Sequence, residues 1–180
     1  MLRLLHMILL GLFGAAAIHI AILFLLPTYS ERDVWSAMAN ESGLNEFVRL
    51  GEDNADPLLA ERQNPFFDAA ACRFDLENGM TRIASGDTVP FWSFSVYDRD
   101  GFNVFNVNDR SATERGLDAL IVNAAQLLEL RKGVPETLAT SLIAQTELGE
   151  GTVVVRVFVP DSSWQAVVDS FFENLRCEPL

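Results

Sequence analysis

The sequence predicts an α+β fold, with a domain built on a mainly antiparallel β-sheet with flanking helices, preceded by one N-terminal transmembrane helix. Three patterns support this fold class. The chain begins with an uncharged apolar stretch, apolar and polar residues alternate along several segments after residue 67, and apolar residues recur at helical spacing near the C-terminus. Strands joined by turns and followed by helices favour an antiparallel sheet with helices laid against it.

We expect three segments in this chain. Residues 1–29 form a cytoplasmic tip and transmembrane anchor, residues 30–65 a juxtamembrane helix and linker, and residues 66–180 a globular exported domain of ordinary size. The net charge is −12, from 25 acidic and 13 basic residues. Such a domain is repelled by nucleic acid and by anionic lipid surfaces, so nucleic acid is not an expected partner.

The lipid bilayer is the expected partner of residues 8–26. At about 1.5 Å per residue, this apolar stretch just spans a hydrocarbon core of roughly 30 Å. A cleavable signal peptide is the alternative, with Ala15 to Ala17 as its cleavage site, but the apolar run continues to Leu26, which favours an uncleaved anchor. Arg3 before the stretch predicts a cytoplasmic N-terminus and an exported domain.

His19 is the one ionisable side chain near the middle of this stretch. Ionisable residues inside a membrane are candidate functional residues, so His19 is one here. The alternative is a neutral imidazole that faces a partner helix or a water defect.

The segment after the anchor predicts little regular structure. Ser30 with Asp33 resembles the capped start of a short helix through Met38. Residues 43–65 are polar and rich in turn residues, and residues 47–50 are their only strand-like piece.

The first core strand is expected over residues 68–76, where every second residue is apolar. A hairpin follows, with strands over 91–97 and 102–108 and a turn in which Gly101 takes the left-handed position. Pairing Tyr97 with Phe102 places five apolar side chains on one face of this hairpin, namely Trp92, Phe94, Val96, Phe105 and Val107.

The C-terminal half predicts two helices and a second hairpin. Asn123 caps a helix through Leu130. Residues 141–148 and 152–159 are expected to pair around the glycines of 149–151. A last helix starts at Asp161 or Ser162 and carries an apolar stripe of Trp164, Val167, Val168, Phe171, Phe172 and Leu175.

Histidine is absent from the exported part, because His6 and His19 both lie in or beside the membrane stretch. This excludes Ser-His-Asp and Cys-His nucleophile systems and nearly all histidine-ligated metal sites. We expect no cofactor and no metal. Asp98 and Asp100 might hold calcium, but they lack EF-hand spacing and favour a plain turn.

The candidate ligand-binding residues lie around the predicted hairpin. Residues 106–110 are the densest polar group next to a strand end, where they either cap the loop or bind a ligand beside an aromatic side chain. The candidates are Trp92, Tyr97, Asn106, Asn108, Asp109 and Arg110. No catalytic residue is assigned, although a pair among the 25 acidic residues is not excluded by composition.

Cys72 and Cys177 are the only cysteines. Two cysteines in one exported domain are most simply a disulfide, here between the first core strand and the end of the last helix. Two separate buried thiols are the alternative.

Five short motifs together resemble membrane-anchored bacterial proteins of the "domain of unknown function 1254" family. They are ACRFDL at 71–76, PFWSFSVYD at 90–98, NVNDR at 106–110, LELR at 128–131 and PDSSW at 160–164. The resemblance implies a single-pass protein of a bacterial inner membrane with a periplasmic domain. It also implies association with a separately encoded counterpart of the "domain of unknown function 1214" type, because longer relatives join the two domains.

The family lends no activity and no catalytic residues. We therefore expect a non-enzymatic cell-envelope module that binds a partner protein or ligand. A carboxylate-dependent enzyme acting on cell-envelope glycans is the alternative.

Overall fold

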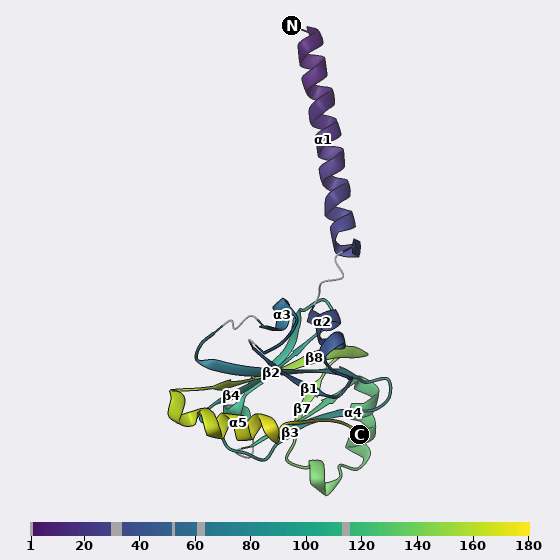
Figure 1. Ribbon diagram of the computed structural model, residues 1–180. Coiled ribbons are helices and arrows are strands. Elements are labelled where there is room, and N and C mark those ends of the chain that lie inside the picture. Colours follow the sequence, from purple (N-terminus) through teal and green to yellow (C-terminus); the bar gives the residue numbers. More distant parts are fainter. Residues whose placement is uncertain (1, 30–33, 52, 61–63, 113–115) are drawn as a thin grey trace. The chain divides into compact units, whose positions relative to one another are not determined.

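The computed structural model describes residues 2–29, 34–51, 53–60, 64–112 and 116–180 (Figure 1). The chain divides into two compact units, residues 1–33 and residues 34–180. The expected helix start at Ser30 and Asp33 lies outside the described residues.

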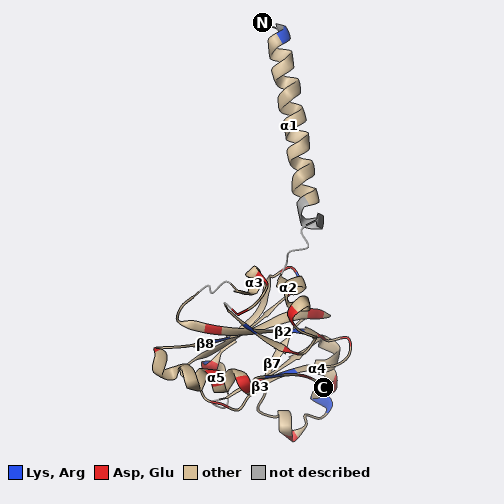
Figure 2. Ribbon diagram, in the orientation of Figure 1, with Lys and Arg blue, Asp and Glu red and all other residues tan. Residues whose placement is uncertain are grey.

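The first unit contains one helix, α1 (Leu2–Tyr29). Its residues Arg3–Leu25 are long and apolar enough to cross a membrane, and a signal sequence has the same properties. Arg3 is the charged residue at its N-terminal end, as Figure 2 shows. His19 is exposed on this helix, and a functional role for it stays a prediction.

The second unit contains two β-sheets, and the α+β fold class is confirmed. The first sheet is antiparallel throughout and follows the order β1 (Phe47–Leu50), β2 (Phe67–Asp75), β8 (Glu150–Phe158), β4 (Trp92–Tyr97), β5 (Asn103–Asn108). The second follows the order β7 (Leu142–Gln145), β6 (Leu117–Val122), β3 (Thr81–Ser85), β9 (Arg176–Pro179). In this second sheet β6 and β7 are parallel and the other pairs are antiparallel.

One hydrophobic core joins the two sheets. Its buried side chains come from β2, β4 and β8 of the first sheet, from all four strands of the second, and from α5 (Gln165–Glu173). Alternate residues of β2, namely Ala70, Cys72 and Phe74, enter this core as the sequence predicted. Burial of such aliphatic and aromatic side chains, at about 25 cal/mol per Å² of apolar surface, is the main source of stability.

Two smaller apolar clusters attach the remaining helices. α2 (Val34–Glu41) and α3 (Pro57–Ala60) pack on the other face of β2 and β8 through Met38 and Leu59. α4 (Ala124–Lys132) and the short helix η2 (Glu136–Leu138) cover the outer side of β6. Asn123 caps α4 by a reciprocal pair of hydrogen bonds with Gln126, as the sequence predicted.

Residues 34–65 belong to the second unit and are not a linker before it. β1 pairs with β2 along its whole length, from Phe47 opposite Cys72 to Leu50 opposite Ala69. Arg73 of β2 donates a 2.7 Å hydrogen bond to the Ser42 carbonyl, and its guanidinium lies over the ring of Trp35 in α2. The polar composition of this segment hid a strand that needs only four residues.

The hairpin of β4 and β5 is confirmed, with a different register. Phe94 lies opposite Val107 and Val96 opposite Phe105, two residues away from the predicted pairing. An irregularity after Val96 absorbs the extra residue. Because the shift is even, the predicted side chains still share one face. Gly101 has a φ of +85°, the left-handed conformation that the turn was expected to need.

The second predicted hairpin is wrong. β7 pairs in parallel with β6, and β8 lies in the other sheet between β2 and β4. Gly151 is part of β8, where a Cβ atom would lie 2.6 Å from the Tyr97 carbonyl oxygen and 2.8 Å from the Phe74 ring. This glycine therefore serves close packing inside a strand instead of a turn.

The C-terminal elements follow the prediction more closely. Asp161 accepts a hydrogen bond from the Ser163 amide and caps the short helix η3 (Ser162–Trp164), which leads into α5. Val168, Phe171 and Leu175 are buried, whereas Trp164 and Val167 are exposed, so the apolar stripe is narrower than expected. Cys177 lies on β9, an edge strand that the sequence did not predict.

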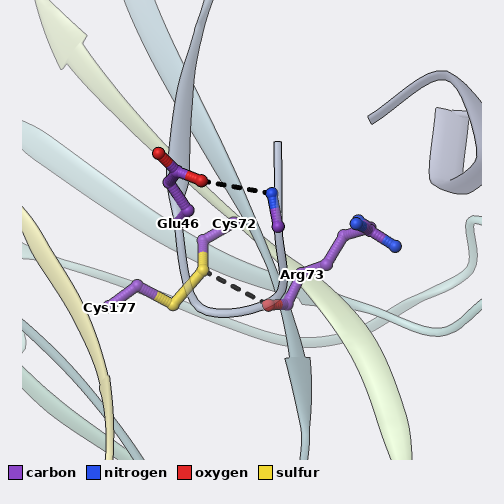
Figure 3. The surroundings of a disulfide bond; sticks show 5 residues. Glu46, Cys72, Arg73 and Cys177 are labelled. Carbon is purple, nitrogen blue, oxygen red and sulfur yellow. Dashed lines mark hydrogen bonds between the residues drawn. A yellow bond between two sulfur atoms is a disulfide. The ribbon is translucent and has the colours of Figure 1, made fainter. Parts of the chain in front are cut away.

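The disulfide between Cys72 and Cys177 is confirmed (Figure 3). It joins β2 to β9, with Cα atoms 6.7 Å apart, and both cysteines are buried in the shared core. It therefore ties the first sheet to the second.

Candidate functional site

The outer face of the first sheet is only partly covered. α2 and α3 pack over its β2 side, while its side over β8, β4 and β5 carries polar residues that no described helix buries. The pairing places Arg156, Ser93 and Asn108 in one row across these strands, and Ser95 and Asn106 in the next. We call this surface the open face; it consists of Ser93, Ser95, Tyr97, Asn106, Asn108 and Arg156.

Hydrogen bonds fix several side chains of the open face. The Asn106 amide donates to the Ser95 hydroxyl at 2.9 Å, and Ser95 is itself buried. Nη2 of Arg156 lies 3.4 Å from the Tyr97 hydroxyl and donates to it. Burial raises the pKa of Tyr97, but hydrogen bonds with Asn103 and Arg156 outweigh this effect and hold the pKa below its ordinary value.

Arg156 supplies a cation among neutral groups. Among the described residues, the ion pairs of Arg49, Arg82 and Arg99 each include a carboxylate, whereas Arg156 forms none. A half-buried guanidinium with free N–H groups next to hydroxyl and amide side chains is suited to bind a carboxylate or phosphate group. The open face is therefore built for recognition by hydrogen bonds.

The structure divides the predicted ligand-binding residues. Tyr97, Asn106 and Asn108 lie on the open face. Trp92 lies on the opposite face of β4, fully buried in the core, and its indole N–H has no hydrogen-bond partner among the described residues. Asp109 belongs to the short helix η1 (Asp109–Ser111) directly after β5.

Asn108 performs the capping role that was the alternative. Its side-chain oxygen accepts a hydrogen bond from the Arg110 amide and so caps η1. Arg110 is exposed beside this cap. Sequence reasoning missed Arg156, although it is the one charged residue in the apolar run 153–158 and so marks a side of β8 that faces away from the core.

Two acids approach each other beside β1, which is the arrangement that a carboxylate-dependent enzyme would need. Arg49 bonds Asp68 at 2.6 Å and Asp169 at 2.7 Å, and Gln165 donates to both at 2.9 and 3.1 Å. The hydrogen bond from Gln165 and the pairing with Arg49 hold the pKa of Asp169 below its ordinary value. A general acid needs the opposite shift, so this cluster fits a structural role.

A cleft of about 360 Å³ lies at one end of the second sheet. Arg82 and Asp118 line it and bond each other twice at 2.9 Å, and the Ser141 hydroxyl donates to the same carboxylate at 2.9 Å. Their charges therefore neutralise each other, and the cleft presents mainly the hydroxyls of Thr88 and Thr140. Among the described residues, no group of three or more His, Cys, Asp or Glu side chains is placed to hold a metal ion.

Comparisons with known proteins show the fold alone. No protein-family profile matches the sequence, and no functionally curated protein is similar to it. The crystal structure of the VPA0106 protein from Vibrio parahaemolyticus is similar, with a TM-score of 0.59 and 12% identity over 81% of this chain and 32% of that one. An uncharacterized protein from Burkholderia cenocepacia matches with a TM-score of 0.47 and 13% identity, over 74% of this chain and 34% of that one.

This chain therefore spans about a third of the length of the Vibrio protein. It combines an apolar N-terminal helix with a disulfide-bonded β domain, which is the organisation of a membrane-anchored or secreted module.

Proposed function

We propose that this protein is a non-enzymatic binding module of the bacterial cell envelope, held in the inner membrane by α1 and exposing its domain to the periplasm. The observation that carries the proposal is the open face. It gathers Tyr97, Arg156 and three amide or hydroxyl side chains on rigid strands, with no opposed pair of acids among its described residues. Such a face binds a partner by polar contacts, while it lacks the groups that acid–base chemistry needs.

The proposed location rests on α1 and the disulfide. Arg3 lies before the apolar residues of α1, which favours a cytoplasmic N-terminus, and disulfides persist in oxidising compartments such as the periplasm. A reporter enzyme that is active only outside the cytoplasm, fused after Leu180, is expected to be active. The mature protein is expected to retain residues 1–29, and an intact mass that begins near Ile18 would contradict the anchor.

The proposed partner is a protein of the "domain of unknown function 1214" type. Two observations support it: the motifs that resemble the "domain of unknown function 1254" family, and the similarity of this chain to one third of a longer Vibrio chain. A fold that occurs within a longer chain has neighbouring domains there, and a separate protein can take their place here.

Affinity purification of the tagged full-length chain from detergent-extracted membranes tests the binding role. A partner protein is expected to copurify in stoichiometric amount. The double variant Arg156→Gln and Tyr97→Phe should reduce its recovery by about tenfold, because two hydrogen-bonding groups of the open face are removed. Arg110→Gln is the matched control, since Arg110 lies exposed outside the open face and should leave recovery unchanged.

The enzyme alternative gives a different result. Purified full-length protein that hydrolyses isolated cell-envelope glycans, and that loses this activity in Asp169→Asn, would replace the binding role with catalysis. Equal recovery of the partner by the parent and by the double variant would show that the open face is not the binding surface.

A further inference from the structure

The four edges of the two sheets differ in how they are protected. An exposed edge strand offers unpaired backbone groups, and proteins usually blunt it with charges, proline or a short length. β9 carries Arg176, Glu178 and Pro179, while β1 carries Arg49, and each has only four residues, as does β7. β5 has six residues, Asn-Val-Phe-Asn-Val-Asn, with neither a charge nor a proline.

The β5 edge is also exposed. Among the described residues, β5 pairs only with β4, so one side of its backbone has no strand beside it. Phe102, just before the strand, is 70% exposed and Val104 is 44% exposed. A long, uncharged edge with exposed apolar side chains matches the surface to which extended peptides add as an extra strand.

We propose that the β5 edge pairs with an extended segment of the partner protein, which adds a sixth strand to the first sheet. This inference rests on the proposed function and names the binding mode of the same region, because the added strand would continue the open face beyond Asn106 and Asn108. Backbone hydrogen bonds would provide affinity, and contacts with Phe102 and Val104 would select apolar side chains in the segment.

The charges around β5 define the chemistry of that segment. Asp98 and Asp100 lie in the turn before β5 and Asp109 follows it. The neighbouring Arg99 is already paired with Glu150 at 2.7 Å. In a protein of net charge −12, these ends favour a partner segment with lysine or arginine on both sides of its apolar residues.

The same charges oppose pairing between two copies of this chain. An antiparallel β5 pair would bring Asp98 and Asp100 of one copy beside Asp109 of the other. Like charges placed next to each other are unfavourable, so a second copy is not the occupant that the edge favours.

Site-specific photocrosslinking in the source bacterium tests this proposal with the full-length protein. A photoreactive amino acid replaces Val104 on the β5 edge or, as the matched control, Ile143 on the β7 edge. The two side chains are 44% and 43% exposed, so they differ mainly in the edge that carries them. We expect an adduct with a different protein from position 104 only, mapped to an extended segment flanked by lysine or arginine.

A pair of charge variants tests the electrostatic part. With the photoreactive residue in place of Phe102, Val104→Lys should lower the adduct yield by about tenfold, because a cation on the edge repels a basic segment. Val104→Glu removes the same apolar side chain but should retain most of the yield. The melting temperature of each variant should match the parent, since Val104 lies on the exposed edge.

The outcomes separate this inference from the proposed function. Adducts that join two copies of this chain, equal adducts from positions 104 and 143, or equal yields in the lysine and glutamate variants would overturn the β5 inference. If a partner still copurifies with the protein but position 104 gives no adduct, the binding role stands and the partner docks elsewhere. If nothing copurifies and no adduct forms, both proposals fail.

Discussion

The two edges of the first sheet are finished in opposite ways. At β1, Arg49 bonds Asp68 and Asp169 and its guanidinium lies 5.1 Å from the Phe172 ring centroid, so side chains from β2 and α5 close the edge. At β5 the strand is uncharged and its apolar side chains are exposed. A sheet that invests its ion pairs at one edge and leaves the other bare has one edge for stability and one edge for binding.

Loss of the disulfide should give the largest effect on this comparison. Cys72 lies opposite Phe47 of β1, and its bond to Cys177 spans 105 residues of sequence. In the chain-entropy model, a ring of about 100 residues stabilises by roughly 4–5 kcal/mol. Cys177→Ser should therefore lower the melting temperature by many degrees. Reducing agent should affect only the parent, and a parent that melts identically with and without it would contradict this.

Arg49→Ala should have the next largest effect. It leaves the buried Asp68 carboxylate without its closest cation, which should cost about 2 kcal/mol after allowance for the partial exposure of Arg49. Urea unfolding followed by circular dichroism measures the change. Arg110→Ala, which removes an exposed arginine next to the binding edge, should change the unfolding free energy by less than about 0.5 kcal/mol.

Gly101→Val tests the β5 side of the sheet. Gly101 has a φ of +85° and open space around its Cα atom, so a β-branched residue is strained there without any clash. We expect a loss of roughly 1–2 kcal/mol. Gly101→Asn is the control, because asparagine adopts this conformation more readily and should lose less. Equal losses in both variants would mean that the turn conformation does not set the stability.

Acid titration should give the smallest effect, and only at the β1 edge. The pKa of Asp169 is lowered in the folded state by its hydrogen bond with Gln165 and by Arg49. A depressed pKa means that the stabilisation is present above the unfolded value of about 4 and is lost as the pH falls through the lower folded value. The difference in melting temperature between the parent and Asp169→Asn should therefore be present at pH 6 and shrink below about pH 4. A difference that does not change with pH would exclude this ionic contribution.

Local patterns predicted the elements whose causes are themselves local. Alternation in 68–76, the capping pair of Asn123 and Gln126, and the turn at Gly101 each depend on neighbouring residues, and all three are present. The register of the β4 and β5 hairpin was missed because an irregularity after Val96 adds a residue that no turn rule predicts.

Causes that lie far away in the sequence were not predictable in this way. Gly151 resembles a turn glycine, but the Tyr97 carbonyl and the Phe74 ring are what exclude a side chain there. The candidate site shows the same limit. Trp92 and Tyr97 are close in sequence yet lie on opposite faces of β4, and Arg156 reaches Tyr97 only because β8 pairs with β4.

The disulfide also divides the domain mechanically. Residues 72–177 form a covalently closed ring that contains β3 to α5, and residues 34–71 are a tail that connects this ring to α1. Tension applied through α1 would peel α2 and β1 from the tail and then reach Cys72, where the covalent bond passes the load directly to Cys177. The β5 edge lies inside the ring and bears none of that load, so a partner held there would stay bound to folded strands while the membrane moves.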